Sequence, residues 1–382
     1  MPINKKIKIL IATYGFFPAQ NYGGPPVSVE NFCNSMSECE VFVVARNHEM
    51  GSVEALQGID DGWNKRSNCN VKYLSDDEYN TVNLGKSMDE TEPDLVYIQT
   101  FFEYKTFISS IRAAAKRKIP VLLAPRGELL MGAMKKKYKK IPYIWIVKKL
   151  WLRGNVFFQA TSEDEHISIL HYFTKEKERI FDLPNFPCVT NELSVSRGDT
   201  YNGLLKVVTL SRIVPKKNIL FACEVMMDVK EELIWDVYGP IEDMKYWEEC
   251  RGLIEKLPKN IHFKYKGSIP HESVFDTLKQ YHVYFFPTQS ENYGHSIVEA
   301  MLAGCIPVIS DRTPWNDLED YNAGYSLELG DTDLFVNALS NLSECSGEML
   351  NSLSENTKMY ARRKLNVNKL KQDYFSVFEM VK

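Results

Sequence analysis

Short hydrophobic runs bounded by turn residues alternate along the chain with longer segments of helical character. In the first half these runs are residues 6–13, 39–45, 94–99, 119–125, 155–161 and 180–184, and in the second half they are 204–211, 233–239, 261–267, 283–288, 306–311 and 324–329. Their hydrophobic residues are continuous rather than alternating, which is typical of strands covered on both faces. The pattern therefore predicts two α/β domains, each a parallel sheet wrapped in helices.

Residues 186–203 separate the two halves, because they are polar, contain Pro and Gly and lack periodicity, as expected of a linker. We assign residues 1–190 to an N-terminal domain and residues 200–362 to a C-terminal domain. Sheets of this kind bind ligands at the carboxyl ends of their strands, so we expect a cleft between the two domains.

Composition narrows the function classes. The chain has 382 residues, 44% hydrophobic and 25% charged, with a net charge of -4, which fits a globular protein and argues against one that coats nucleic acid. No stretch reaches the ~18 apolar residues that a spanning helix needs. Eight scattered cysteines without a CxxC pair indicate reduced thiols in a cytoplasmic protein rather than disulfides or metal ligands. Neither half has GxGxxG after its first strand, which argues against a dinucleotide oxidoreductase.

Two loops could bind an anion. Gly23 and Gly24 precede a predicted helix, whose first amides can bind a phosphate, although a simple tight turn explains them equally well. Arg212 and Lys217 follow the first strand of the second half and suit a diphosphate. The alternative for this pair is a solvated loop.

The segment SENYGHSIVEAMLAG, residues 290–304, holds two glutamates in an otherwise hydrophobic context. It lies between two predicted strands, so Gly294 marks a turn that leads into a helix. Glu291 then precedes the helix and Glu299 lies within its first two turns, leaning back toward its start. Both carboxylates suit sugar or ribose hydroxyls beside a phosphate. The alternative is that both are ordinary surface acids.

At this point the sequence resembles the retaining glycosyltransferases of family 4. The matching pieces are NYGGPP, APRGEL, FQATSEDE, DLPNF, LSRIVPKKN, DVYGP, YKGSIP and PTQSENYGHSIVEAMLAGCIPVIS, and they span most of the chain. The resemblance implies the GT-B architecture, an α/β fold of two Rossmann-like, doubly wound parallel-sheet domains facing across a cleft. It also implies that a terminal helix, residues 363–382, crosses back to the first domain. Apolar residues at helical spacing, Leu370, Tyr374, Val377 and Met380, fit that helix.

The resemblance assigns roles to matching residues. Arg212 and Lys217 would bind the donor diphosphate, Glu291 the hydroxyls of the transferred sugar, and Glu299 the ribose. Further donor contacts would come from Asn292, Tyr293, Gly294, His295 and Ser296, from Gly267 and Ser268 near the nucleobase, and from Gly23 and Gly24 in the other domain.

One position departs from many relatives, which have a histidine where this chain reads PRGEL with Arg126. A subset that builds bacterial surface polysaccharides resembles this version. Arginine stays protonated at neutral pH and cannot be a general base, so we expect Arg126 to position a phosphate or the acceptor. Glu128 is a weaker candidate for an acceptor contact. Glu291, Arg212, Lys217 and Arg126 are thus the candidate catalytic residues.

The resemblance implies transfer with retention, in which the leaving phosphate takes the acceptor's proton. We expect no metal and no other cofactor, because the cations and helix amides would stabilise the diphosphate. DTD at 331–333 and SEDE at 162–165 are interpreted as helix caps rather than a metal clamp.

The segment from 134 to 153 has eight basic residues, no acid and interleaved aromatics. It suits an anionic membrane surface at the inner face of the cell membrane, although a helix packed on the sheet would also explain it. Pro142 predicts two short helical pieces.

The leading hypothesis is a transferase that moves a hexose from a UDP- or GDP-sugar to a hydroxyl of a lipid-linked glycan acceptor, during synthesis of a capsule, O-antigen or exopolysaccharide. The alternatives are a non-catalytic sugar-nucleotide-binding protein and a GT-B sugar phosphorylase.

Overall fold

The computed structural model describes residues 6–130, 134, 137–150, 155–188 and 203–382. The chain divides into two compact units, and we call residues 1–189 with 367–382 unit 1 and residues 190–366 unit 2. Each is a sheet, wholly parallel in unit 2 and parallel except for one edge pair in unit 1, covered by helices on both faces, as the hydrophobic pattern predicts. The expected cleft between the two units stays a prediction.

Unit 1 is built on an eight-stranded sheet in the order β3-β4-β2-β1-β5-β6-β7-β8. Its strands are β1 (Lys8–Ala12), β2 (Glu40–Arg46), β3 (Trp63–Arg66), β4 (Cys69–Leu74), β5 (Leu95–Ile98), β6 (Val121–Leu123), β7 (Val156–Ala160) and β8 (Ile180–Asp182). All neighbours are parallel except β3 and β4. The six hydrophobic runs of the first half are confirmed as strands, but the edge pair β3 and β4 was not predicted. Partly exposed polar side chains on β3 leave no continuous hydrophobic signal there.

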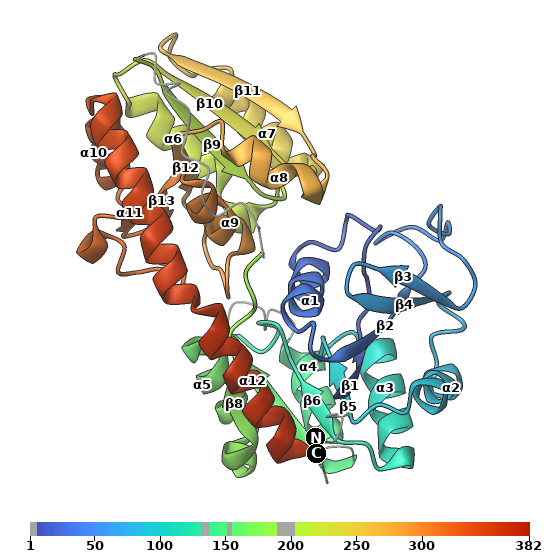
Figure 1. Cartoon of the computed structure of the whole chain (residues 1–382). Helices are drawn as coiled ribbons and strands as arrows, with labels where there is room; N and C mark the ends of the chain where they lie inside the picture. The colour runs from blue at the N-terminus through green and yellow to red at the C-terminus, as the bar shows by residue number, and fades with distance from the viewer. Residues whose placement is uncertain (1–5, 131–133, 135–136, 151–154, 189–202) are drawn as a thin grey trace. The chain divides into compact units, whose positions relative to one another are not determined.

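The helices of unit 1 are α1 (Gly24–Ser35), α2 (Thr81–Thr91), α3 (Tyr104–Arg117), α4 (Lys137–Leu150), α5 (Glu163–Tyr172) and α12 (Val367–Val381), with a 3-10 helix η2 (Thr174–Arg179). Alternate residues of β1 face opposite layers. Ile9 and Ile11 pack with α1 and α12, whereas Leu10 packs with α2 to α5. The last helix of the chain therefore completes the core of the first unit, as Figure 1 shows.

Unit 2 has a six-stranded parallel sheet in the order β11-β10-β9-β12-β13-β14. Its strands are β9 (Leu205–Leu210), β10 (Leu233–Tyr238), β11 (Ile261–Gly267), β12 (Val283–Phe286), β13 (Ile306–Ser310) and β14 (Tyr325–Leu327). Its helices are α6 (Ile219–Asp228), α7 (Met244–Ile254), α8 (His271–Leu278), α9 (His295–Ala303), α10 (Thr332–Ser343) and α11 (Gly347–Leu365), with 3-10 helices η3 (Pro215–Lys217) and η4 (Glu319–Tyr321). One face packs on α6, α7 and α10 and the other on α8, α9 and α11. All six predicted strands of the second half are present.

The end of the chain differs in detail from the expectation. Residues 363–365 continue α11 in unit 2, and the helix of unit 1 begins only at Val367, after the break at Asn366. Met380 is 66% exposed, so the buried face of α12 is completed by Phe378 and Val381 instead. The helical spacing of the sequence does not show whether Met380 lies in the buried face of the helix or at the edge of that face.

The predicted linker, 186–203, lies mostly outside the described residues. Its first residue is not linker-like, because Phe186 is buried and stacks on Tyr374 with ring centroids 5.0 Å apart. Six of the eight cysteines are buried in the two cores. Within the described part of the chain, no helix is both long enough and apolar enough to cross a membrane.

Candidate active site

The candidate donor residues of unit 2 gather where the strand order of its sheet reverses. From β9 the chain proceeds to β10 and β11 on one side, and it then returns to β12 on the other side of β9. Loops that leave the carboxyl ends of two such strands diverge and open a crevice, which is where open α/β sheets bind ligands. Lys217 follows β9 and Glu291 follows β12, so both lie at this switch point.

Backbone hydrogen bonds hold these two loops together. Gln289 N donates to Lys216 O at 2.9 Å, and Thr288 Oγ1 donates to the same oxygen at 3.1 Å. Lys217 Nζ then donates to Glu291 Oε1, and each of the two side chains is only 13% exposed. The structure thus brings together two predicted site residues that are 74 positions apart.

Arg212 also follows β9, but it does not join this pair. Its Nη1 lies 3.2 Å and 2.9 Å from the two carboxylate oxygens of Glu242, which follows β10. Both side chains are substantially exposed, at 40% and 31%. The sequence analysis missed Glu242, since nothing in its neighbourhood marks it as the partner of a residue 30 positions earlier.

Gly294 starts α9 as predicted and needs to be glycine. Its backbone is left-handed, with φ 76° and ψ 63°, and an added Cβ would lie 2.8 Å from Ile297 Cδ1. As a glycine, Gly294 has no side chain to cap the first amides of α9, which leaves them suited to a ligand oxygen. Tyr284 fixes this helix to the sheet, because its hydroxyl donates to Leu210 O at 3.0 Å and can accept from Ser296 Oγ, 2.7 Å away.

The loop before α9 contributes residues of different exposure. Tyr293 is buried, and its carbonyl oxygen accepts a hydrogen bond from Trp315 Nε1 at 2.8 Å. Its ring lies 4.8 Å from that of His295. Burial raises the pKa of the Tyr293 hydroxyl well above its ordinary value, so this residue stays a neutral phenol. Asn292, beside it, is partly exposed.

Glu299 lies in the second turn of α9 and is almost fully buried, with 8% of its side chain exposed. Its Oε1 is 3.0 Å from His271 Nε2 at the start of α8. The loop containing Gly267 and Ser268 leads directly into this histidine, and Ser268 is exposed. The structure therefore places the predicted ribose ligand beside the predicted nucleobase loop. His271 was missed by the sequence analysis, although YKGSIPH ends on it.

In unit 1, Gly23 caps the start of α1 with φ 72°, and Gly24 is the first helical residue. No side chain caps this helix. Pro25 and Pro26 follow, and proline has no N–H, so two of the amides that would bind an anion are missing. The glycine loop is consequently a poorer phosphate site than α9.

Arg126 follows β6 in a left-handed conformation, with φ 56°. Its Nε donates to Gln99 Oε1 at 2.8 Å, and its Nη1 donates to Asn185 Oδ1. The next residue is held in place as well, because Gly127 N donates to the buried carboxylate of Glu165. Arg126 is thus fixed by neutral side chains at the carboxyl edge of the sheet of unit 1.

The structure does not favour Glu128 as an acceptor contact. Its two oxygens accept hydrogen bonds from Phe101 N and Phe102 N, both at 2.7 Å, and from Thr100 Oγ1 at 2.8 Å. Burial raises the pKa of the Glu128 carboxyl above its ordinary value of 4.5, although these hydrogen bonds oppose the shift. Glu128 stabilises the loop before α3 instead.

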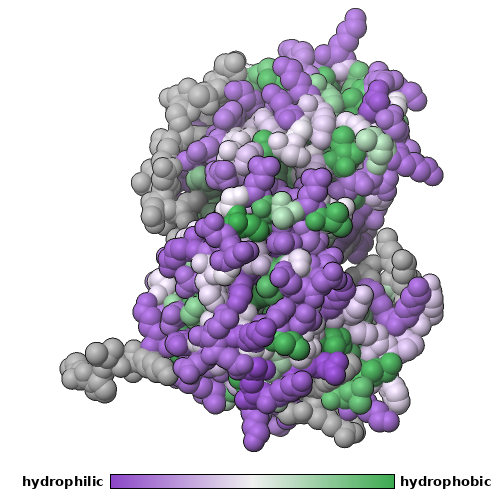
Figure 2. All heavy atoms as spheres, turned by 90° about the vertical axis from the view of Figure 1, so that its right-hand side faces the viewer, coloured by the Kyte–Doolittle hydropathy of each residue, from purple (hydrophilic) through white to green (hydrophobic). Residues whose placement is uncertain are grey.

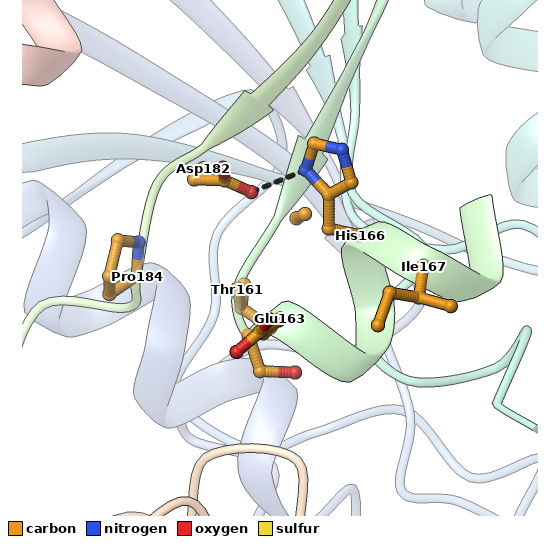
Figure 3. Close-up of a pocket in the computed structure, with 8 residues that line it drawn as sticks. Thr161, Glu163, His166, Ile167, Asp182 and Pro184 are labelled. Atoms are coloured by element: carbon orange, nitrogen blue, oxygen red, sulfur yellow. Dashed lines mark hydrogen bonds and ion pairs between the residues drawn. The ribbon is translucent and has the colours of Figure 1, made fainter. Parts of the chain in front are cut away.

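A cavity of about 510 Å³ lies at the carboxyl ends of β7 and β8, beside the first turn of α5 (Figure 3). Its lining residues include Thr161, Glu163, Ile167 and Pro184, and His166 Nδ1 lies 2.7 Å from Asp182 Oδ1 at its margin. The sequence analysis did not find this cavity, because its walls come from separate strand ends and loops.

The basic segment forms one continuous helix rather than two pieces. Pro142 is the sixth residue of α4, so it removes only one helical hydrogen bond near the beginning of the helix. Ile144 and Val147 are buried against the sheet. Tyr143 is partly buried against the same core. Five other hydrophobic residues face solvent, namely Tyr138, Ile141, Trp145, Ile146 and Leu150, which are 43% to 73% exposed. Figure 2 shows one face of the molecule, where hydrophilic residues predominate and hydrophobic residues form small separate groups.

The two acidic motifs are helix caps, as predicted. Asp331 accepts hydrogen bonds from Asp333 N and Leu334 N at the start of α10, and Ser162 accepts one from Glu165 N at the start of α5. In the described part of the chain, no group of three or more His, Cys, Asp or Glu side chains is placed to hold a metal.

Comparison with known proteins gives one family-model match and several similar solved structures. Residues 196–360 match the family model of "Glycosyl transferases group 1". No curated protein sequence matches the chain. HepE from Anabaena, solved in complex with UDP and glucose, is 14% identical with a TM-score of 0.74, and the match covers 98% of this chain and 100% of that chain. Sucrose-phosphate synthase from Thermosynechococcus elongatus is 14% identical with a TM-score of 0.69, covering 99% of both chains. The lipopolysaccharide outer core galactosyltransferase WaaB, in its apo form, is 16% identical with a TM-score of 0.60, covering 97% of this chain and 99% of that chain.

The chain has the GT-B fold. The segment that matches the group 1 family model contains every candidate donor residue of unit 2, from Arg212 to Glu299. It does not include Gly23, Gly24 or Arg126. The match and the GT-B neighbours together support a glycosyltransferase.

Proposed function

We propose that this chain is a retaining glycosyltransferase of the family 4 type, which moves a hexose from a UDP-sugar, or from a GDP-sugar, to a hydroxyl of a glycan. The observation that carries this proposal is the pairing of Lys217 with Glu291 beside the uncapped start of α9, at the switch point of unit 2. The matched family model supports sugar transfer. The complexes of HepE with UDP and with UDP-glucose support a uridine nucleotide.

The proposed donor uses the cation and the acid of this pair for different groups. Lys217 would bind the diphosphate, together with the amides at the start of α9, and Glu291 would accept hydrogen bonds from hydroxyls of the sugar. Arg212 would move from Glu242 to the diphosphate. That exchange costs little, because an exposed ion pair contributes only about 0–1 kcal/mol. Glu299, held by His271, would bind the ribose.

In the proposed reaction the bond between the anomeric carbon and the diphosphate oxygen breaks, and a bond from the acceptor oxygen to that carbon forms on the same face. The proton of the acceptor hydroxyl passes to the leaving phosphate oxygen. Negative charge grows on the diphosphate during this step, so fixed cations and amides lower the barrier most when they contact that group. Lys217, Arg212 and the start of α9 supply such contacts without a metal.

The proposed acceptor is a glycan, carried on a lipid, in the synthesis of a bacterial surface polysaccharide. The cavity beside α5 lies in unit 1, and its volume of about 510 Å³ falls in the range of small-molecule sites. Arg126 lies at the same sheet edge, where it would position the acceptor. In this proposal unit 1 binds the acceptor and unit 2 binds the sugar-nucleotide donor.

We also propose that α4 contacts the inner face of the cell membrane. Its exposed Tyr138, Trp145 and Leu150 alternate with lysines, and the segment 134–153 contains no acid. Aromatic and aliphatic side chains enter the headgroup region while each nearby cation contributes about 1 kcal/mol. Trp145→Ser should reduce sedimentation with phosphatidylglycerol vesicles, whereas Val82→Ser, at an exposed position of α2, should not. Equal sedimentation of both variants would contradict the membrane role.

A donor screen tests the central proposal. Purified protein is incubated with a panel of UDP-, GDP- and ADP-sugars, and release of the nucleoside diphosphate is measured with and without EDTA. We expect slow hydrolysis of one donor, insensitive to EDTA. Once an acceptor is found, the anomeric coupling constant of the product in a proton NMR spectrum distinguishes retention from inversion.

The same screen separates the alternatives. A non-catalytic binding protein would bind a sugar nucleotide without releasing its diphosphate. A sugar phosphorylase would carry an aldehyde cofactor with its own absorbance and would consume inorganic phosphate. Either result would replace the transferase.

A further inference from the structure

Within the described part of the chain, the guanidinium of Arg126 hydrogen-bonds to neutral side chains alone. Its Nε is 2.8 Å from Gln99 Oε1, its Nη2 is 3.3 Å from the Tyr97 hydroxyl, and its Nη1 donates to Asn185 Oδ1. Among the residues that the structure describes, no carboxylate forms an ion pair with Arg126. Because a partly buried charge is normally paired, this cation has the surroundings of a group that awaits an anion.

The amide of Gln99 supplies a second, independent sign. Its side chain is fully buried, and its Nε2 has no hydrogen-bond partner among the described residues. Arginine can only donate, so Gln99 must turn its oxygen toward Arg126 and leave its NH₂ group beside the guanidinium. Buried donors of this kind are rare in native structures, and a missing ligand is one common explanation.

The site is also rigid. The Tyr97 hydroxyl donates to Gln159 Oε1, and Gln159 Nε2 donates to Leu183 O at 2.6 Å and to Tyr374 at 2.7 Å. This network extends from β5 through β7 to α12, all within unit 1. A cation held in this way needs little reorganisation when a ligand binds.

The cavity of unit 1 shares loops with the cation. Pro184 lines the cavity, and the next residue, Asn185, contacts Arg126. Thr161 also lines the cavity and donates through its N–H to Glu165 at 2.9 Å, and Glu165 in turn accepts from Gly127. The cavity and Arg126 thus lie on neighbouring segments of unit 1.

We propose that the acceptor is anionic and that Arg126 and the amide of Gln99 bind its phosphate or carboxylate. This inference rests on the proposed function and adds the chemical class of the acceptor to it. A planar guanidinium matches both anions through paired hydrogen bonds. A phosphate would come from a phosphate-linked sugar and a carboxylate from a uronic acid.

The test compares three probes of matched size by NMR titration of the full chain, namely glucose 1-phosphate, methyl glucuronide and methyl glucoside. At least one anionic probe should bind about tenfold more tightly than the neutral one, or about 1.4 kcal/mol. Preference for the phosphate indicates a phosphate-linked acceptor, and preference for the carboxylate indicates a uronic acid glycan.

Three variants test whether Arg126 and Gln99 cause the preference for an anionic probe. Gln99→Glu places a carboxylate beside Arg126 with almost no change of shape, so it should abolish the preference while the fold is kept. Arg126→Gln should abolish it as well. Arg112→Gln removes the same charge from an exposed position of α3 and should leave the preference intact.

Equal binding of all three probes by the wild type would overturn the inference, as would a preference that survives Gln99→Glu or is lost in Arg112→Gln. Displacement of the anionic probe by saturating UDP would also overturn it, because Arg126 would then serve the donor. Binding of UDP to the wild type is measured separately. If UDP does not bind, the proposed function fails, whereas UDP binding without an anion preference defeats only this inference.

Discussion

Replacing Glu299 by Gln tests the most specific part of the proposed donor site. Glu299 has 8% of its side chain exposed, and its Oε1 lies 3.0 Å from His271 Nε2. Gln keeps the length of the side chain and one acceptor oxygen for His271, so the fold should persist. Ala would remove that acceptor from His271, at a cost of about 1–3 kcal/mol in stability.

The magnitude follows from the hydrogen bonds that a carboxylate makes. A hydrogen bond to a charged group contributes about 1.5–3 kcal/mol, and Gln removes the charge and one of the two acceptor oxygens. Loss of one such bond to the ribose should weaken UDP binding by about 10-fold to 150-fold. Titration calorimetry measures this change directly, with unfolding by urea as the check on stability.

A double-mutant cycle makes the assay specific for the ribose. Wild-type protein should bind 2′-deoxy-UDP more weakly than UDP, and Glu299→Gln should no longer distinguish the two, because the contact is already lost. Glu249→Gln, at an exposed position of α7, provides the matched control. UDP affinity within twofold of wild type in the Glu299 variant would refute the ribose assignment.

Three further predictions concern charge, backbone and pH. Lys217→Met should weaken UDP binding at least tenfold in calorimetry but leave uridine binding unchanged, because only the diphosphate contacts the Lys217 ammonium. An equal loss of affinity for UDP and uridine would indicate misfolding. Gly294→Ala should destabilise the protein by about 1–2 kcal/mol, because φ is 76° at this position. Gly252→Ala, inside α7 with open space around it, should instead stabilise the protein by about 0.5–1 kcal/mol. If thermal unfolding ranked the two variants the other way, the left-handed conformation of Gly294 would be contradicted. Burial raises the pKa of the Glu128 carboxyl, so the folded protein holds the carboxyl proton more tightly than the unfolded chain does. Proton binding by Glu128 therefore stabilises the folded state below the ordinary pKa of 4.5, and this contribution is lost as pH rises through the raised pKa. The free energy of unfolding of the wild type relative to Glu128→Gln should accordingly fall as pH rises above the ordinary pKa of 4.5. A pH-independent difference in urea titrations would show that the pKa is not raised.

The strands of both sheets were predictable because their signal is local. A parallel strand buried on both faces must be hydrophobic along its length, and the runs at 94–99 and 283–288 show this directly. The edge strand β3 escaped prediction because it is only partly covered, and β4 beside it escaped because its buried residues alternate with partly exposed polar ones. The helix caps at Ser162 and Asp331 were predictable for the same local reason, since a cap and its partners lie within three residues.

The sequence by itself determined the α/β pattern, the glycine turn at Gly294 and the spacing of Glu291 and Glu299 around it. Only the tertiary structure decided which polar side chains meet: Lys217 with Glu291, Arg212 with Glu242, and Glu299 with His271. It also decided that Arg126 lies among neutral oxygens. The physical reason is that these contacts join loops that follow different strands. Which strands are neighbours depends on how both faces of the sheet pack, so no single segment of the sequence determines it.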